Sequence, residues 1–374
     1  MPRTVWVICL AAVLLSGLLG QSLATTTVVV GPSTCKPAYV HFSTIQSAVS
    51  ASPFGTIIMV CPGTYPEQVT INQPLTLEGV TDGTGNAAVI TVPGGGLVQN
   101  GTSVSFGPVA VQLLVENTVG VTIKNLAVDG NGANCPAGSN RNVGIGVFNV
   151  GTPNDGTAAA IISNVVVRNE LNCFGDGILA DTSYMTVTAS EIHDINQTAI
   201  DAYSAKYSIT NNSIQRAFAY GIVLLNNASG SVVSGNNVSD GSTGILSTNN
   251  FNAATITKNT VLNNSFAGVY LYFAYHQSVT QNVISRSPWG LIVEFGFQDT
   301  LQNNKISDAA ADGILDFNSF GGNIITLNTV NEGFFGIFAD GSTGGDTLVP
   351  NSFFNVVFTI DPGPVTVPPP PPLP

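Results

Sequence analysis

The second half of this chain repeats a short marker, a Gly followed by a branched apolar residue, at intervals of 22 to 24 residues. Eight units begin at positions 177, 199 (where Ala replaces Gly), 221, 244, 268, 290, 313 and 336. A second column keeps the same interval: Ser190, Asn212, Asn236, Asn259, Asn282, Asn304, Asn328 and Asn351. Two columns in phase over eight units predict a solenoid in which each repeat stacks on the next.

Each repeat carries three apolar positions: one follows the Gly, one lies three residues before the Asn column, and one lies two residues after it. Apolar residues alternate with Thr, Ser or Asn around these positions, and this period of two is typical of a β-strand. Three short strands per repeat make one coil of a parallel β-helix, with coils about 4.8 Å apart. We therefore expect an all-β solenoid of about nine coils.

The Asn column is expected at a bend, where stacked side-chain amides can hydrogen-bond along the axis. A leucine-rich repeat would need several Leu and a helical segment in each unit, and neither is present. A propeller blade would need about 40 residues, which the spacing excludes.

The sequence predicts four regions. Residues 1–24 have the features of a secretory signal: a positive Arg3, an apolar run over 5–19 and a small-residue cleavage site at 22–24. A retained membrane anchor is the alternative, although the run is short for a bilayer span. Residues 25–80 are expected to form an N-terminal cap and first coil, residues 81–360 the β-helix domain, and residues 361–374 an extended proline-rich tail.

Composition narrows the range of partners. The 374 residues carry a net charge of −12, and only 9% of them are charged. This acidic balance argues against nucleic acid and against anionic membranes, so no membrane contact is expected beyond the signal peptide. We expect a secreted, periplasmic or cell-surface protein.

Four cysteines follow the expected signal, and an even number in an exported chain suggests disulfides. We pair Cys35 with Cys61 and Cys135 with Cys173, since each pair lies within one or two coils. Zinc binding is the alternative, but no close Cys pair or neighbouring His supports it. We expect no bound metal.

A short helix is expected near the N-terminus, where Ser43 can cap it and Ile45, Ala48 and Val49 form one apolar face. Such a helix would cover the open edge of the solenoid. Between residues 80 and 160 the period is looser, and loops at 93–108, 129–142 and 151–156 are expected to rise as walls beside one face.

Residues 42–49 (FSTIQSAV), 56–65 (TIIMVCPGTY) and 75–79 (LTLEG) resemble the entry module of pectin-lyase-like right-handed β-helix proteins. The repeats from about 160 to 355 resemble the generic repeats of that superfamily. The resemblance implies a right-handed parallel β-helix and, because exported members often trimerise, a homo-oligomer. The superfamily includes pectate lyases, polygalacturonases, alginate epimerases, phage tailspikes, adhesins and a protein of nitrous-oxide-reductase maturation, so the resemblance does not select one activity.

The catalytic motifs of those enzymes are missing. The chain has no Asn-Thr-Asp, Asp-Asp, Gly-His-Gly or Arg-Ile-Lys set as in polygalacturonases, and no Arg-x-Pro-x-x-Arg as in pectate lyases. The Asp-Pro-His-Asp of alginate epimerases has only a partial counterpart in residues 191–194, EIHD. Other repeats place Gln, Ser or Leu where His193 lies, which is typical of a solvated bend.

The strands that open the repeats present two outward columns. The first is Leu179, Asp201, Val223, Leu246, Tyr270, Ile292, Leu315 and Phe338; the second is Asp181, Tyr203, Leu225, Thr248, Tyr272, Glu294, Phe317 and Asp340. This face is unusually apolar for a solvated sheet, and an exposed apolar stripe marks a binding or association surface.

Two interpretations of the stripe stay open. In the first, it binds an extended polysaccharide, with Tyr203, Tyr270, Tyr272 and Phe317 as stacking platforms and Glu294 beside them. In the second, it packs against another copy of the chain or against a loop from the 93–156 region.

Asp181 and Asp201 form a candidate catalytic pair. They lie one coil and two residues apart, so we expect about 8 Å between them, the separation of the two carboxyls in inverting glycosidases. The alternative is two solvated acids near turns. Asp176 and Asp312 lie in Asp-Gly-Ile turns and are interpreted as bend residues.

The sequence thus favours a non-catalytic module that binds a glycan or a partner chain through its aromatic strand face. The rival is a glycoside hydrolase that uses Asp181 and Asp201 on a neutral glycan. Lys and Arg number only 10 and are scattered, so acidic polysaccharides are poor candidates. No cofactor is expected, and copper-site assembly lacks support because the chain has only 3 His and 3 Met.

Overall fold

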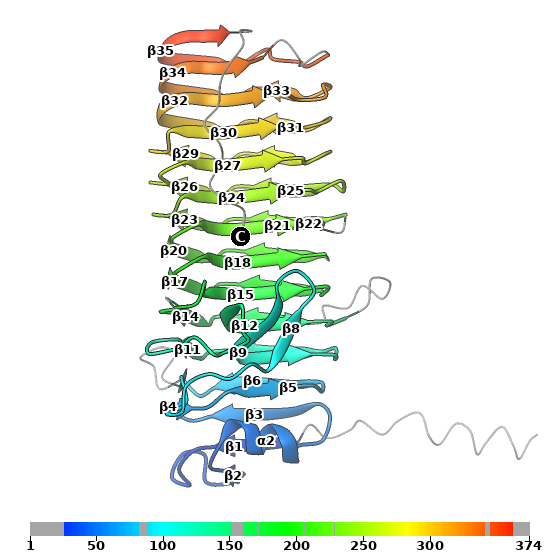
Figure 1. The fold of residues 1–374 in the computed structure, drawn as a ribbon, viewed down its shortest axis with the longest axis vertical. Helices are drawn as coiled ribbons and strands as arrows, with labels where there is room; N and C mark the ends of the chain where they lie inside the picture. Colours follow the sequence, from blue (N-terminus) through cyan, green and yellow to red (C-terminus); the bar gives the residue numbers. More distant parts are fainter. Residues whose placement is uncertain are drawn as a thin grey trace, which may run out of the picture.

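The computed structural model describes residues 26–81, 88–151, 160–170, 172–204, 206–227, 229–340 and 345–361. They form one tall stack of parallel coils, a β-helix, with a single short helix at its N-terminal end (Figure 1). The expected signal, residues 1–24, lies outside the described residues, as does the proline-rich tail from residue 362 onward. No helix within the described residues is long and apolar enough to cross a membrane.

One side of the stack is a parallel sheet of 13 strands, so the solenoid has more coils than the nine we expected. The predicted number of coils was too low because long loops in the coils before residue 160 interrupt the 22- to 24-residue repeat. In spatial order the strands are β2 (Val40–Phe42), β1 (Thr27–Val30), β3 (Thr56–Val60), β6 (Leu75–Gly79), β10 (Val121–Lys124), β13 (Ala160–Ser163), β16 (Met185–Thr188), β19 (Tyr207–Thr210), β22 (Ser231–Ser234), β25 (Ala254–Thr257), β28 (Ser278–Thr280), β31 (Thr300–Gln302) and β33 (Ile324–Thr326).

A second side consists of short strands, one in each coil. They are β4 (Gly63–Pro66), β7 (Ala88–Thr91), β11 (Ala127–Asp129), β14 (Val166–Arg168), β17 (Glu191–Ile195), β20 (Ser213–Ala217), β23 (Asn237–Ser239), β26 (Thr260–Leu262) and β29 (Val283–Ser285). Each pairs in parallel with the equivalent strand of the next coil.

The third side consists of longer strands that begin near the Gly markers. They are β5 (Val69–Ile71), β9 (Gly107–Glu116), β12 (Arg141–Phe148), β15 (Asp176–Asp181), β18 (Thr198–Tyr203), β21 (Tyr220–Leu225), β24 (Thr243–Thr248), β27 (Ala267–Tyr272) and β30 (Trp289–Glu294). In the last coils the second and third sides merge into β32 (Lys305–Phe317), β34 (Thr329–Ala339) and β35 (Ser352–Asp361). The long-strand side carries the candidate site.

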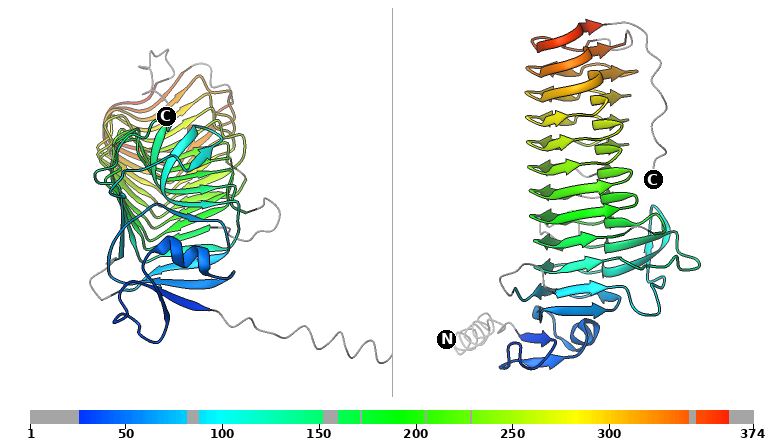
Figure 2. Two further views of the ribbon diagram at one scale, coloured as in Figure 1. Left: turned by 60° about the horizontal axis from the view of Figure 1, so that its bottom comes forward. Right: turned by 90° about the vertical axis from the view of Figure 1, so that its left-hand side faces the viewer.

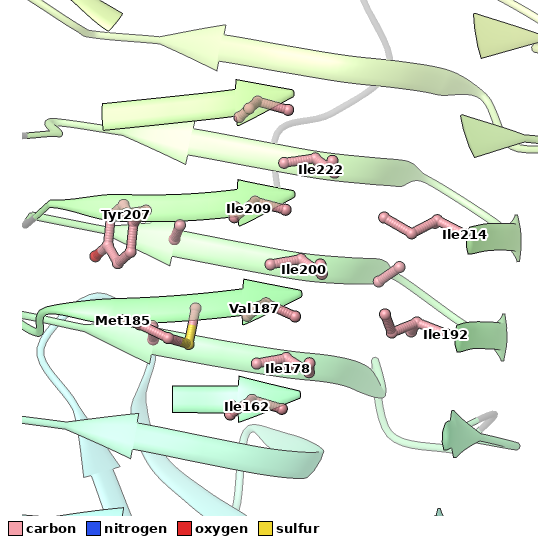
Figure 3. Close-up of a cluster of buried hydrophobic side chains, with 14 of the residues drawn as sticks. Ile162, Ile178, Met185, Val187, Ile192, Ile200, Tyr207, Ile209, Ile214 and Ile222 are labelled. Atoms are coloured by element: carbon pink, nitrogen blue, oxygen red, sulfur yellow. The ribbon is translucent and has the colours of Figure 1, made fainter. Parts of the chain in front are cut away.

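The interior of the stack is filled by the three apolar positions of each repeat. Figure 3 shows Ile178, Ile200 and Ile222 in one row, beside the pairs Val187 with Ile209 and Ile192 with Ile214. All of these side chains are buried. Each buried aliphatic side chain contributes about 1.5–3 kcal/mol, so the core grows in proportion to the number of coils.

The Asn column forms the expected amide ladder. Asn236 Nδ2 donates to Asn259 Oδ1 at 3.0 Å, and Asn259 Nδ2 donates to Asn282 Oδ1 at 3.0 Å. The same Nδ2 groups also donate to the backbone carbonyls of Ile209 and Val233. The ladder therefore satisfies buried backbone groups at the bend as well as joining successive coils.

The Gly markers lie where two strands of a coil meet at a corner. A Cβ at position 244 would lie 2.3 Å from Val261 Cγ1 and 2.7 Å from the Gly268 carbonyl oxygen of the next coil. Close approach of neighbouring coils therefore explains the recurring Gly.

The N-terminal end is closed by helix α2 (Ile45–Ala51), as expected. Thr44, not Ser43, is the N-cap residue, and its hydroxyl accepts a hydrogen bond from Ser47 N. Glu67 accepts two further bonds, from the backbone N–H groups of Ile45 and Gln46. Ser43 lies one residue too early because the helix begins only where the Glu67 carboxylate meets its free N–H groups.

Both expected disulfides are present. Cys35 is joined to Cys61 near the N-terminal cap, with 6.3 Å between the Cα atoms. Cys135 is joined to Cys173, with 5.4 Å between the Cα atoms, and fastens the 129–142 loop to the coil that contains β15.

Candidate functional site

On the long-strand side, the first outward column is buried, although the sequence predicted an exposed stripe. Leu179, Val223, Leu246 and Leu315 are each at most 1% exposed. They form two clusters separate from the interior core, one around Leu179 and Tyr203 and one from Tyr220 to Phe338. The correction has a physical reason, because large side chains in the flanking columns and an inserted hairpin shield this column.

The hairpin covers the lower cluster. Strand β8 (Gly101–Ser103) pairs antiparallel with the start of β9, and the hairpin projects from the stack near β12 and β15 (Figure 2, right). Phe106 at its tip meets the Tyr203 ring edge-on, with 5.1 Å between ring centroids. Ser103 Oγ donates to Asp181 Oδ2 at 2.6 Å. The predicted loop wall at 93–108 is therefore a lid over part of the face.

Four acidic side chains and one arginine are buried in this part of the stack: Glu170, Asp176, Asp181, Asp201 and Arg141. Arg141 Nη1 donates to Asp176 Oδ2 at 2.7 Å, and the Arg141 guanidinium lies 3.6 Å above the Phe106 ring centroid. Burial raises the pKa of Asp176 to about 6, although Arg141 acts in the opposite direction. Asp176 is thus the partner of a buried cation, which gives it a larger role than the bend residue we expected.

The structure brings the predicted pair, Asp181 and Asp201, onto adjacent coils, with Asp201 aligned to Leu179 and Asp181 to Tyr203. Asp181 is held by Ser103, by Ser105 N at 3.1 Å and by Thr182 Oγ1 at 3.1 Å. Neither carboxylate oxygen of Asp201 has a hydrogen-bond partner among the described residues. Burial, and then repulsion from Asp176, raise the pKa of Asp201 well above its ordinary value.

Both members of the pair are sealed from solvent, since Asp181 is 1% exposed and Asp201 is 0% exposed. The sequence predicted either an open catalytic pair or two solvated acids, and neither interpretation anticipated burial. Burial without a partner disfavours the charged form of a carboxyl, which is why the pKa of Asp201 is raised. In this arrangement the Asp201 carboxyl has no contact with solvent.

Glu170 is a further buried acid, and the sequence analysis missed it. It is 1% exposed, and its two carboxylate oxygens have no partner among the described residues. Burial, with repulsion from Asp129 and Asp176, raises the pKa of Glu170 to about 8. Glu170 and Arg141 lie outside the repeat columns, so only the long insertions before them hinted at a special role.

An open cavity of about 330 Å³ lies next to the hairpin and extends over three coils. Its described lining is Ser105, Phe106, Tyr203, Val223, Leu225, Thr248 and Asn249. This lining combines two aromatic rings and two aliphatic side chains with three neutral polar groups, and it contains no carboxylate. Of the predicted ligand-binding residues, only Tyr203 borders the cavity.

The other predicted ligand-binding residues lie together higher on the same face. Tyr272 is aligned with Glu294, and Glu294 with Phe317, in successive coils. The Tyr270 hydroxyl donates to Glu294 Oε2. Three coils, or about 14 Å, separate Tyr270 from Asp201, so these residues and the cavity form two parts of one long face.

A second aromatic group, missed from sequence, lies at the bend that follows the long strands. The rings of Phe273 and Phe295 stack with 4.4 Å between centroids, and Tyr275 packs against Phe251 and Phe297. Phe273 and Phe295 occupy equivalent positions in successive repeats, as do Tyr275 and Phe297, so the repeat interval is the signal that could have found them.

His193, the partial counterpart of an epimerase motif, lies on the short-strand side, away from the acidic cluster. His193 Nδ1 lies 2.6 Å from Asp194 Oδ2, and Asp194 also accepts a bond from Arg216 Nε at 2.6 Å. The Arg216 bond lowers the pKa of Asp194 below its ordinary value. This is a surface ion-pair network, and such networks contribute little to stability.

Two family models match parts of the chain. The model for a right handed beta helix region matches residues 111–282, and the model for periplasmic copper-binding protein (NosD) matches residues 224–362. No curated protein matches the sequence significantly. The NosD model describes a periplasmic protein. The two disulfides of this chain indicate an extracytoplasmic location.

Solved structures share the fold. The A-module of the mannuronan C-5 epimerase AlgE4 from Azotobacter vinelandii is 19% identical, with a TM-score of 0.65, over 84% of this chain and 91% of that chain. The GH136 lacto-N-biosidase from Eubacterium ramulus is 12% identical, with a TM-score of 0.59, over 92% of this chain and 69% of that chain. At these identities the likeness establishes the fold alone.

The residues do not fit a copper site of the kind that the NosD description implies. Within residues 224–362 the sequence has no Cys, no Met and a single His, His276. The described residues contain no group of three His, Cys, Asp or Glu side chains that could hold a metal ion. Copper is bound by imidazole and sulfur ligands, which this segment lacks.

The stacked strands, the N-terminal helix and the matching right-handed β-helix model agree on one assignment. The chain folds as a right-handed parallel β-helix, and its residues 111–282 match the family model for a right handed beta helix region.

Proposed function

We propose that this protein is a non-catalytic module that binds a neutral glycan in the cavity beside the hairpin. The observation that carries the proposal is the lining of the 330 Å³ cavity, which has aromatic and aliphatic walls, neutral polar groups and no carboxylate. The apolar faces of sugar rings pack on aromatic side chains, while hydroxyls of Ser and Thr and amides of Asn fix orientation.

The polar groups are placed to select a sugar. Ser105 and Phe106 come from the hairpin, Tyr203 and Leu225 from adjacent long strands, and Asn249 from the bend after β24. Five residues from four separate parts of the chain thus surround one space, which is typical of a binding site. No charged side chain is among its described lining residues, so a neutral glycan suits it better than a polyuronate.

A binding assay tests this proposal. We would select an oligosaccharide on a glycan array and measure its dissociation constant by titration calorimetry. Leu225→Ala and Thr248→Val should each weaken binding about tenfold, because each removes roughly 1–2 kcal/mol of contact in the cavity. The matched control is Thr260→Val, an exposed position of β26 on another side of the stack, which should bind like the parent.

The outcome is informative in both directions. Weaker binding in the two cavity variants, with an unchanged melting temperature, supports the cavity as the site. Unchanged affinity in both variants, or no binding to any glycan on the array, would remove the proposal. Association into a homo-oligomer, such as a trimer, stays a separate prediction.

A second candidate function, glycoside hydrolysis, is favoured by one observation: the buried carboxyl of Asp201 has no partner and a strongly raised pKa. Such perturbed acids cluster at catalytic sites. With the hairpin open, protonated Asp201 would give its proton to the glycosidic oxygen while Asp181 takes a proton from the water that attacks the anomeric carbon.

The two candidates differ in what happens to the glycan. Hydrolysis predicts new reducing ends, which disappear in Asp181→Asn and Asp201→Asn while binding persists. The binding module predicts that the selected glycan is recovered intact after prolonged incubation with the parent protein.

A further inference from the structure

The bend that follows the long strands carries a group of aromatic side chains, which we call the aromatic corner. The pairing of β24, β27, β30 and β32 places the bend residues of four successive coils in register. The rings occupy the first bend position in two of these coils and the third bend position in all four: Phe273 and Phe295, and then Phe251, Tyr275, Phe297 and Phe320.

The rings of the aromatic corner contact one another and face solvent. Phe273 and Phe295 stack with 4.4 Å between ring centroids, and Tyr275 packs against Phe251 with 5.0 Å between centroids. Phe320 lies 6.3 Å from Phe295 and so joins the two rows of rings. Phe251 and Phe320 are 55% and 56% exposed, and the other rings are half-buried. A contiguous exposed apolar patch of this kind marks a binding or association surface.

The backbone at the first bend position is an independent sign of function. Phe273 has a φ of 47° and Phe295 a φ of 52°, both in the left-handed region. At the same position the neighbouring coils have Asn226, Asn249 and Asn318, with φ of 49°, 49° and 50°. Asn tolerates this conformation, whereas a bulky aromatic residue is strained in it. The bend itself is therefore satisfied by Asn, and strain kept at two surface Phe residues points to a use for their rings.

The aromatic corner continues the cavity beside the hairpin. Thr248 and Asn249 line the upper end of that cavity. Thr248 is aligned with Tyr272 of the next coil, and Asn249 N donates to the Tyr272 carbonyl oxygen at 3.0 Å. Phe273 therefore lies one coil above Asn249, and Phe295 lies one coil higher, at about 4.8 Å per coil. A chain that leaves the cavity past Asn249 meets these two rings in turn.

The corner has the same neutral chemistry as the cavity. Residues 249–251, 273–276, 295–298 and 318–320 include no Asp, Glu, Lys or Arg. From the coil of Tyr203 to the coil of Phe320 there are five steps, or about 24 Å. A short oligosaccharide would fill the cavity and leave the corner empty.

We propose that the ligand is an extended neutral polysaccharide, which occupies the cavity with one part and stacks further sugar rings on the aromatic corner. This inference rests on the proposed function, because the cavity supplies the first binding position. It adds the class of ligand, a polymer, and the direction in which it lies, along the axis of the solenoid. Exposed aromatic rings in line suit such a chain, since each offers a flat apolar face to a sugar ring.

The double variant Phe273→Asn/Phe295→Asn tests the corner. It installs the residue that neighbouring coils have at this bend, so the fold should persist. We would measure affinity by native gel electrophoresis in gels that contain barley β-glucan, xyloglucan, arabinoxylan or galactomannan. The parent should be retarded by at least one of these polymers, and the dissociation constant for that polymer should rise about tenfold in the double variant. The control is Phe218→Asn, a 75% exposed Phe at the other end of the long strands, which should bind like the parent.

Chain length separates the corner from the cavity. Calorimetry with a disaccharide and a hexasaccharide of the retarding polymer should show that Phe273→Asn/Phe295→Asn weakens only the hexasaccharide. Leu225→Ala, in the cavity, should weaken both. Weaker binding in Leu225→Ala alone would overturn the aromatic corner as a site and leave the proposed function standing, whereas no effect of Leu225→Ala would remove the proposed function itself.

Two further outcomes would overturn the inference. The first is that none of the four polymers retards the parent. The second is that light scattering finds an oligomer for the parent and a monomer for Phe273→Asn/Phe295→Asn, since the corner would then be an interface between copies of this chain. Far-UV circular dichroism and melting temperature check that each variant folds like the parent.

Discussion

Asn259 lies in the middle of the amide ladder and serves four hydrogen bonds at once. Its Oδ1 accepts from Asn236 N and Nδ2, and its Nδ2 donates to Val233 O and Asn282 Oδ1. The residue is 1% exposed, so water cannot replace these partners. The Asn259 side chain therefore stabilises the fold by providing hydrogen-bond partners to buried polar groups in three successive coils.

We predict that Asn259→Ala lowers the free energy of unfolding by about 2–4 kcal/mol, because it strands buried donors and an acceptor. Urea denaturation followed by circular dichroism measures the change. Asn237→Ala is the matched control, since Asn237 is an exposed Asn in the neighbouring strand and should change stability by less than about 0.5 kcal/mol. A loss for Asn259→Ala no larger than that of the control would contradict the ladder.

Glu170 gives a pH prediction at the same scale. Its pKa of about 8 in the folded protein lies above the ordinary 4.5, so the folded state holds a proton that the unfolded state releases. The stabilisation is complete below about pH 4.5 and is lost as the pH rises through 8. Relative to Glu170→Gln, the parent should lose on the order of 4 kcal/mol between pH 4 and pH 9.

Unfolding free energies of parent and Glu170→Gln at pH 4, 6.5 and 9 check this prediction. The control is Glu116→Gln, which leaves the buried cluster untouched. Glu67→Gln is unsuitable as a control because Glu67 accepts a hydrogen bond from the first residue of helix α2. Parallel pH curves for the parent and Glu170→Gln would show that Glu170 is ionised or solvated.

At the scale of the repeated element, the Gly column sets how closely coils approach. Gly244→Ala would place a methyl group 2.3 Å from Val261 Cγ1, so the corner must distort at a cost of about 1–3 kcal/mol. Gly94→Ala meets nothing within 4 Å and should be tolerated. Thermal unfolding of the two variants compares them directly, and equal melting temperatures would argue against close packing at the corner.

The N-terminal cap is an element with its own covalent tie. Cys35 and Cys61 close a loop with a sequence separation of 26, and Cys61 lies directly after β3. The double variant Cys35→Ser/Cys61→Ser should lose about 3–4 kcal/mol of stability, through the greater freedom of the unfolded chain. Hydrogen exchange should show the loss first in β1, β2 and α2, and uniform loosening of all coils would contradict a local cap.

The sequence predicted the elements of the repeat because each column serves one physical need. Gly244 avoids a clash, Asn259 satisfies buried groups, and Ile200 fills the core, so each type recurs at the same interval. The helix boundary was displaced by one residue, since Glu67, a distant residue, determines where α2 begins.

The candidate site could be predicted only in part. Asp181 and Asp201 were placed on adjacent coils by counting, and the structure has them there. Their burial could not be predicted, because it depends on Phe106 and Arg141, which lie in insertions outside the repeat. The sequence repeat predicts where a column of residues lies on the solenoid. It does not predict which residues of an inserted loop pack over that column.

At the scale of the whole molecule, one long face carries three regions in series. The lowest is the buried acidic cluster near the hairpin, the next is the open neutral cavity, and the highest is the packed aromatic part of the Tyr220–Phe338 cluster. The right-handed β-helix places them in line because every coil adds one rung to the same side. A glycan bound in the cavity would lie beside, and not on, the buried acids.

The most direct test of this account is a crystal structure of the protein with the oligosaccharide that it binds most tightly on the array. We predict an intact sugar ring in the cavity, packed between Tyr203 and Leu225, with hydroxyl groups bonded to Thr248 or Asn249. A glycan bound on another side of the solenoid, or one cleaved beside Asp181 and Asp201, would contradict a non-catalytic neutral-glycan site.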